Sequence, residues 1–237
     1  AAIVAKYGPL AIAAKSQHAY NRTLKWEPRL RSDAEAALRR ILWFPDDVRA
    51  EDRLCLGDWC TARGVELMIQ YNLPLKIHTG YYAGYGRMPV ERIRPGHLWP
   101  LLTAYPDARF VLMHVGYPYY DEILAIAKHY PNVWVDLCWA WSIDPRSTSE
   151  FVRRFLHTAP VNKILAFGGD TTWPTHAAAY AIQARRWLAR TLQAEVDEGD
   201  LTEKEAITVA TRLMRDNQYD LFPLEETRKA ILNASAA

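Results

Sequence analysis

The sequence predicts an α/β protein built around a parallel sheet. Short apolar runs rich in β-branched residues alternate with longer segments of helical period, which is the pattern of repeated βα units. The chain has 237 residues, half of them hydrophobic, and a single (β/α)8 barrel commonly uses about 250 residues. We therefore expect residues 1–237 to form one domain with one core.

Five apolar runs are the expected strands. Their continuous apolar character predicts that both faces of each strand are covered. The ranges are Leu10–Ala14, Leu75–His78, Arg109–His114, Val133–Leu137 and Lys163–Phe167. Five parallel strands could be strands 4 to 8 of a (β/α)8 TIM barrel with the first three βα units missing, or a complete open five-stranded parallel sheet. The truncated barrel is favoured, because the opening residues AAIVAKYGP have the character of a helix end that leads into a strand.

Helices are expected between these strands. Residues 50–71 should form one helix, and Thr202 with Glu205 should form a capping box at the start of another. Polar residues at 32–33 and at 147–150 precede two further helical segments. They are the expected caps of those helices.

Charge and composition narrow the functional class. A formal net charge of +2, from 29 basic and 27 acidic side chains, creates no large field of one sign and argues against a nucleic-acid partner. The sequence lacks a long apolar run and the pattern of a signal peptide, so we expect a cytoplasmic protein without a membrane partner. The cysteines Cys55, Cys60 and Cys138 lack C-x-x-C spacing and are expected to be buried, reduced thiols.

Potential metal ligands lie at the ends of the predicted strands. The five ends are Lys15, His78, His114, Cys138 and Asp170. Strands of a parallel sheet all end at the same side, so these residues should converge. Two imidazoles and a carboxylate are suitable ligands for a divalent metal, most simply zinc. Each residue alone is equally consistent with a structural role, as a hydrogen-bonded histidine or a helix cap, and only the joint placement favours the metal.

Several motifs carry a family resemblance. KIHTG, VLMHVGYP, NVWVDLCW and ILAFGGDTTWP occur in that order and are followed by RDNQYDLFPLE. This succession resembles the second half of the amidohydrolase superfamily, specifically the amidohydrolase-2 branch of metal-dependent TIM-barrel hydrolases, over nearly the whole chain. The resemblance implies that His78 is the fifth-strand metal ligand and that His114 is the sixth-strand histidine, which binds metal or a developing oxyanion. It also implies that Asp170 is the eighth-strand acid, which binds metal and transfers the proton.

Lys15 falls where some members of this superfamily carry a carboxylated lysine that bridges two metals. Solvation, or the binding of a substrate anion, is the alternative role for Lys15. One element of the family pattern is missing, because the first-strand His-x-His does not occur in this sequence. Either the first three βα units lie upstream of Ala1 or the site is degenerate. Residues 1–237 alone are therefore expected to bind metal weakly and to be a poor catalyst.

The expected function is that of a metal-dependent hydrolase, in which metal-activated water attacks a carboxamide, lactone or related carbonyl of a small-molecule substrate. A decarboxylase or uronate-isomerase-like enzyme of the same superfamily is one alternative, and a non-catalytic ligand-binding barrel fragment is another. The loops after the strands hold the predicted substrate-binding residues, which are Arg22, Tyr20, Tyr81, Tyr82, Trp139 and Trp173. Arg22 and Arg87 are candidates to hold a substrate carboxylate. The unpaired edges of an opened barrel also predict a homo-oligomer or association with a missing N-terminal portion.

Overall fold

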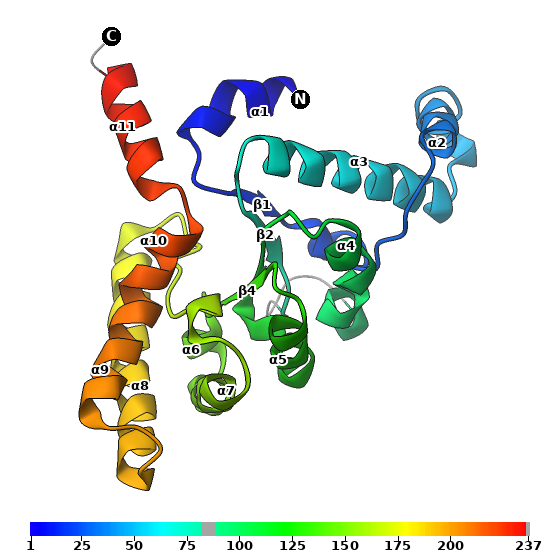
Figure 1. Ribbon diagram of the computed structural model, residues 1–237. Helices are drawn as coiled ribbons and strands as arrows, with labels where there is room; N and C mark the ends of the chain where they lie inside the picture. Colours follow the sequence, from blue (N-terminus) through cyan, green and yellow to red (C-terminus); the bar gives the residue numbers. More distant parts are fainter. Residues whose placement is uncertain (82–88, 236–237) are drawn as a thin grey trace.

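A computed structural model describes residues 1–81 and 89–235 (Figure 1). Five parallel strands form one sheet whose strand order follows the chain. The strands are β1 (Ala14–Ser16), β2 (Leu75–His78), β3 (Phe110–Met113), β4 (Val133–Asp136) and β5 (Ile164–Leu165). The predicted α/β class with a five-stranded parallel sheet is thereby confirmed.

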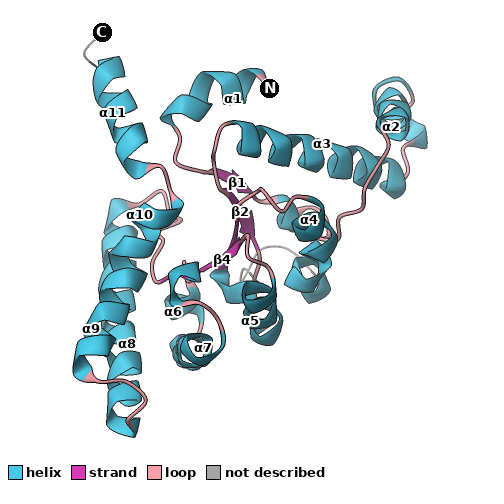
Figure 2. Ribbon diagram, in the orientation of Figure 1, coloured by secondary structure: helices cyan, strands magenta, loops and turns pink. Residues whose placement is uncertain are grey.

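Helices connect the strands and extend beyond them (Figure 2). Up to β5 they are α1 (Ala2–Tyr7), α2 (Arg31–Trp43), α3 (Ala50–Gln70), α4 (Trp99–Ala104), α5 (Tyr120–His129), α6 (Ala140–Ile143) and α7 (Pro145–Thr158). After β5 come α8 (Pro174–Glu198), α9 (Glu203–Thr211), α10 (Asn217–Leu221) and α11 (Leu224–Ser235). Helices α8 and α9 pack side by side, whereas α2 and the start of α3 lie far from the sheet (Figures 1 and 2).

The two faces of the sheet pack against different partners. Alternate side chains of each strand join the main hydrophobic core with the connecting helices, and we call this side the outer face. Its strand residues are Leu75, Ile77, Phe110, Leu112, Val133, Val135 and Ile164. The opposite, inner face contributes Val111 and Leu165 to a small separate cluster with Leu221 and Phe222. The segment that joins α10 to α11 therefore covers part of the inner face.

Strand boundaries differ from the prediction at the two edges of the sheet. Strand β1 starts only at Ala14, because Gly8–Leu10 form a 3-10 turn around Pro9, which lacks a backbone N–H for the sheet. Strand β5 is limited to two residues, since the next amide, that of Ala166, donates to the carbonyl of Leu213 and not to a neighbouring strand. A local signal, Pro9, thus shortens β1, whereas a contact with a distant segment, which no local pattern reveals, shortens β5.

Two helix caps were predicted wrongly. Helix α2 already begins at Arg31, so residues 32–33 lie inside its first turn. Helix α7 is capped by Asp144, whose carboxylate accepts the amide of Ser147, so residues 147–150 are inside the helix. Pro145 at the first helical position explains the earlier start, because its fixed φ suits that position. The single helix across residues 50–70 and the capping box at 202–205 are confirmed.

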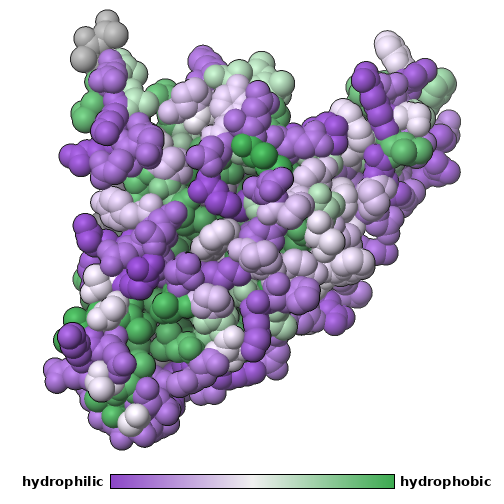
Figure 3. Space-filling model, viewed as in Figure 1, coloured by the Kyte–Doolittle hydropathy of each residue, from purple (hydrophilic) through white to green (hydrophobic). Residues whose placement is uncertain are grey.

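The face shown in Figure 3 is mostly hydrophilic, with apolar residues gathered over the region of α8 and α9. Within the described ranges, no helix combines the length and apolar character needed to cross a membrane. All three cysteines are free, and Cys55 and Cys138 are buried as predicted. Cys60 is exposed, which corrects the prediction for that residue, because it lies on the side of α3 away from the core.

Candidate metal centre

Side chains from all five strand regions meet at the carboxyl edge of the sheet. Lys15 lies in β1 and His78 is the last residue of β2. His114 directly follows β3, Cys138 lies two residues after β4, and Asp170 lies in the loop after β5. Parallel strands in sequential order bring these residues together, although 155 positions separate Lys15 from Asp170.

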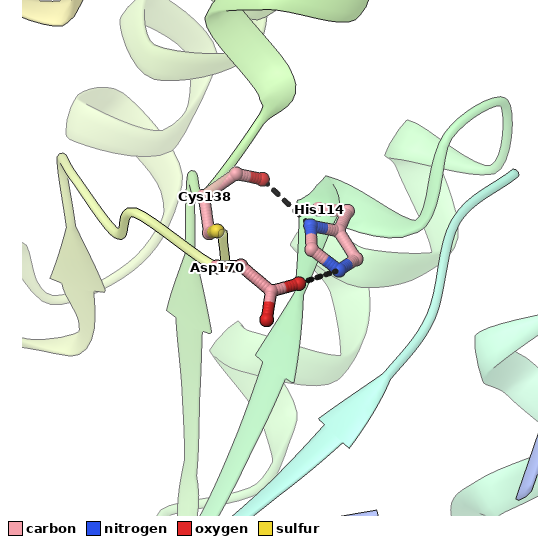
Figure 4. A group of neighbouring side chains, drawn as sticks. All are labelled: His114, Cys138 and Asp170. Atoms are coloured by element: carbon pink, nitrogen blue, oxygen red, sulfur yellow. Dashed lines mark hydrogen bonds and ion pairs between the residues drawn. The ribbon is translucent and has the colours of Figure 1, made fainter. Parts of the chain in front are cut away.

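His114 lies at the centre of the group. Its Nε2 is 3.1 Å from Nδ1 of His78 and 3.7 Å from Oδ2 of Asp170. Figure 4 shows His114 between the Asp170 carboxylate and the backbone carbonyl of Cys138. The ammonium of Lys15 contacts the other carboxylate oxygen of Asp170. One ligand atom each from His114, Cys138 and Asp170 lie within 4.8 Å of one another, which is compatible with a shared metal ion.

The hydrogen-bond partners of the two imidazoles fix where their protons lie. Nδ1 of His114 donates to the carbonyl of Cys138 at 2.7 Å, and Nε2 of His78 donates to the carbonyl of Gly80 at 3.2 Å. A carbonyl oxygen can only accept, so in each neutral ring the other nitrogen carries a lone pair. Those two unprotonated nitrogens face each other, and beside them lies Oδ2 of Asp170, which is buried and has no hydrogen-bond partner among the described residues. Three acceptor atoms without a proton between them form a site suited to a cation.

Burial keeps both imidazoles neutral. It lowers the pKa of His78 to about 3, and the nearby His114 and Lys15 contribute to the shift. Burial likewise lowers the pKa of His114. Metal ligation requires the neutral imidazole, so at neutral pH neither ring has to lose a proton before it binds an ion.

The backbone near the site adopts unusual conformations. His114, Val115, Trp139 and Asp170 all have positive φ angles, between 36° and 64°. Non-glycine residues seldom occupy this region, and for β-branched Val115 the conformation is especially unfavourable. Such strain persists only where the surrounding packing over-determines the backbone, and it gathers at functional sites. No sequence signal indicated these positions.

Two of the predicted aromatic residues contact the imidazoles directly. The ring of Tyr20 is 4.5 Å from that of His78, between centroids. The indole of Trp139 stacks on His114, with centroids 4.7 Å apart and planes inclined by 17°. Both rings therefore border the candidate metal site.

A cleft of about 1030 Å³ opens next to Asp170. It is lined by Gln17, Tyr81, Trp139, Ser142, Ile143, Asp170, Thr171, Thr172, Trp173, His176 and Tyr180. Among the predicted substrate-binding residues, Tyr81, Trp139 and Trp173 belong to this lining. Tyr180 was missed, because its place within the long helical pattern of α8 gives no indication that it faces a cleft.

Arg22 is the predicted residue that the structure places elsewhere. Its guanidinium pairs with the buried carboxylate of Asp58 at 2.6 Å and donates to the carbonyls of Leu54 and Lys25. These partners occupy the donors that a substrate carboxylate would need, so Arg22 holds the loop after β1 against α3. Tyr82 and Arg87 lie outside the described residues.

Fold and site together define a partial α/β barrel whose strand ends bring candidate metal ligands together. Residues 26–224 match the family model described as Amidohydrolase. The chain belongs to the amidohydrolase superfamily.

Individual proteins are also similar to the chain. The chain is 29% identical to protein fluG of Emericella nidulans in an alignment 234 residues long, which covers 92% of this chain and 26% of that protein. It resembles the crystal structure of a protein assigned as a metal-dependent hydrolase from Lactobacillus casei, with a TM-score of 0.71 and 23% identity over 90% of this chain and 55% of the other. It also resembles uronate isomerase from Thermotoga maritima, with a TM-score of 0.70 and 14% identity over 85% and 48% of the two chains.

The chain spans about a quarter of the length of fluG and about half of the solved structures. The structural matches therefore support the fold of a partial barrel. At these identities they indicate the fold alone.

Proposed function

We propose that the chain contributes the His, His and Asp ligands of a metal-dependent hydrolase. The supporting observation is the convergence of three unprotonated acceptors, His78 Nδ1, His114 Nε2 and Asp170 Oδ2, at the carboxyl edge of the sheet. Nitrogen and oxygen donors of this kind favour zinc. When bound, a divalent metal would lower the pKa of a coordinated water and polarise a substrate carbonyl.

The residues of the chain divide the remaining work. His78 and His114 would hold the ion, because both present a lone pair and are neutral. Asp170 would accept a proton from the nucleophilic water and return it to the leaving group. Lys15 would provide positive charge beside Asp170, and carboxylation of its amine would convert it into a further oxygen ligand.

The aromatic residues of the cleft suit the substrate of such a hydrolase. The rings of Tyr81, Trp139 and Trp173 offer flat apolar area beside Asp170, which suits a carboxamide or lactone with a flat, apolar body.

Metal titration of the chain tests the ligand set. Because the sequence supplies only part of the family's ligands, we expect weak binding of Co²⁺ or Zn²⁺, which is lost in His78→Ala and His114→Ala. His129→Ala, which removes an exposed histidine of α5, is the matched control and should bind as the parent chain does. Equal binding by the parent chain and both ligand variants would refute the assignment.

Asp170→Asn tests the proton transfer. In the enzyme complete with the first-strand ligands, this variant should fold normally and lose turnover, because an amide cannot take the proton. Turnover equal to that of the parent enzyme would remove Asp170 from the mechanism.

We also propose that a further segment or a second copy of the chain pairs with the edge of the sheet at β1. Among the described residues β1 pairs only with β2, so its other edge is open to a partner, whereas β5 is buried and its Ile164 carbonyl accepts a hydrogen bond from Nδ2 of Asn217. Light scattering that finds only a monomer, at concentrations up to those of the metal titration, would contradict self-association.

A further inference from the structure

An ion pair lies on the inner face of the sheet, below the candidate metal ligands. Nζ of Lys76 in β2 is 2.6 Å from Oδ2 of Asp136 in β4, so the pair spans the intervening strand β3. The Asp136 side chain is 1% exposed and that of Lys76 is 22% exposed. Burial alone would lower the pKa of Lys76, but the Asp136 carboxylate outweighs this effect and raises it, so the amine remains charged.

A buried ion pair of this kind contributes little net stability to the pairing of two strands. Desolvation of the two charges cancels much of their attraction, and well-packed apolar residues often serve stability as well. The other contacts of Asp136 therefore indicate what the pair does.

Asp136 connects the ion pair to His114 through the backbone N–H and the backbone carbonyl of Cys138. Its Oδ1 accepts the backbone N–H of Cys138 at 2.9 Å. The carbonyl of the same residue, Cys138, accepts Nδ1–H of His114 at 2.7 Å. A continuous path of polar contacts therefore runs from the Lys76 ammonium through the Asp136 carboxylate and the Cys138 backbone to the His114 imidazole. The Cys138 carbonyl at the end of this path determines which nitrogen of His114 carries the proton.

Gly168 permits the close packing of this path. A Cβ at residue 168 would lie 2.9 Å from Cβ of Cys138 and 3.2 Å from Oδ1 of Asp136. At the adjacent Gly169, the nearest atom to an added Cβ is Cβ of Ala177, at 3.4 Å. The loop that carries Asp170 can therefore cross the Asp136–Cys138 turn only if residue 168 has no side chain.

We propose that Lys76 and Asp136 are positioning residues that set the tautomer and orientation of His114. With the Cys138 carbonyl fixed, His114 keeps its proton on Nδ1 and directs the Nε2 lone pair towards His78 and Asp170. The value of this arrangement for metal binding rests on the function proposed above. The tautomer itself is a property of the metal-free chain and is measured separately.

Long-range ¹H–¹⁵N correlation spectra of the metal-free chain, labelled with ¹⁵N-histidine, report the tautomer at neutral pH. The parent chain should show His114 protonated on Nδ1. Asp136→Ala should give a mixture of tautomers, since the Cys138 amide loses its acceptor. Asp136→Asn keeps an oxygen acceptor for that amide but turns an NH2 group towards Lys76, so it should retain the proton on Nδ1 more fully than Asp136→Ala does.

Gly168→Ala is the second route to the same result, because it displaces the Asp136–Cys138 turn without removing a polar group. Gly169→Ala is its matched control and should leave the tautomer unchanged. The inference is overturned if His114 stays fully protonated on Nδ1 in folded Asp136→Ala or in folded Gly168→Ala. It is also overturned if the parent chain itself shows the proton on Nε2.

Co²⁺ titration separates this inference from the proposed function. Loss of a group that orients a metal-bound histidine typically lowers metal affinity by about 10-fold to 100-fold, and Asp136→Ala should fall in that range. A parent chain that binds no Co²⁺, although Asp136→Ala shifts the tautomer, would refute the metal-site proposal and leave the positioning role intact. Metal binding by the parent chain, together with an unchanged tautomer in the variants, would refute the positioning role and leave the metal-site proposal intact.

Discussion

The outer and inner faces of the sheet differ in composition although they share the same strands. The outer face carries apolar side chains such as Phe110, Leu112 and Val135, which pack against the connecting helices. The inner face carries a small apolar cluster together with Lys76, His78 and Asp136. Successive residues of a strand point to opposite faces, so one stretch of chain can serve both surfaces.

This difference separates stability from chemistry. The outer face buries apolar area, which is the main favourable term in folding. The inner face instead buries charges and lone pairs, whose desolvation lowers the stability of the fold, and we attribute them to function. Mutations on the two faces should therefore have distinct consequences, and four experiments examine this contrast.

The largest effect is expected on the outer face. Phe110 is fully buried in the main core, so Phe110→Ala should lower the free energy of unfolding by about 3–5 kcal/mol. Ile207→Ala, at a position of α9 that is 61% exposed, is the control and should change it by less than about 0.5 kcal/mol. Urea unfolding followed by circular dichroism measures both. A loss below about 1 kcal/mol for Phe110→Ala would show that the outer face does not carry the stability.

Breaking the ion pair should have the next largest effect. Lys76→Met leaves the buried carboxylate of Asp136 unpaired and should cost about 3 kcal/mol. The double variant Lys76→Met with Asp136→Leu should regain most of that stability, while its affinity for Co²⁺ stays reduced. Urea unfolding and metal titration of both variants test the contrast. Full recovery of both properties in the double variant would mean that the pair is structural only.

Protonation of His18 should weaken the fold in mild acid. Burial, aided by Arg22, lowers the pKa of His18 from 6.5 to about 4. Between these values the unfolded chain binds a proton that the folded chain does not, so stability falls as the pH drops through this window and is unaffected above it. We expect a loss of about 2 kcal/mol, allowing for partial exposure to solvent. Urea unfolding at pH 7.5 and pH 4.5 should show a smaller difference for His18→Gln, and an equal difference would exclude His18.

The smallest effect concerns a helix end remote from both faces. Oγ1 of Thr202 accepts a hydrogen bond from the backbone N–H of Glu205, and the backbone N–H of Thr202 donates to the Glu205 carboxylate. Thr202→Ala should therefore lower the free energy of unfolding by about 1 kcal/mol. Thr202→Ser keeps the hydroxyl and should be nearly neutral. Thermal unfolding measures both, and equal melting temperatures for the parent and the alanine variant would show that α9 does not need its cap.

The sequence was informative where the signal was local. The apolar run at 75–78 predicted β2 with both boundaries, and the strand ends directed attention to His78, His114 and Asp170. The strand and the convergence of these side chains could be predicted because strand period and strand ending are properties of neighbouring residues, while the role of the side chains as metal ligands stays a prediction. The prediction for Arg22 failed for the opposite reason, since its partner Asp58 lies 36 positions away on α3.

Other features had no sequence signal at all. Lys76 lies within an apparently apolar strand, and its partner Asp136 is 60 residues further along the chain. The left-handed backbone at Val115 contradicts the preference of a β-branched residue, so no propensity could indicate it. Tyr180 reached the cleft only because α8 packs along that side of the molecule.

The sequence by itself determined the alternation of strands and helices and the placement of histidine and aspartate at strand ends. The reason is that periodicity and strand termination are encoded over a few consecutive residues. Only the tertiary structure decided which nitrogen of each imidazole is unprotonated and which oxygen of Asp170 points towards those nitrogens. Those properties depend on carbonyls and charges that remote segments bring within hydrogen-bond distance.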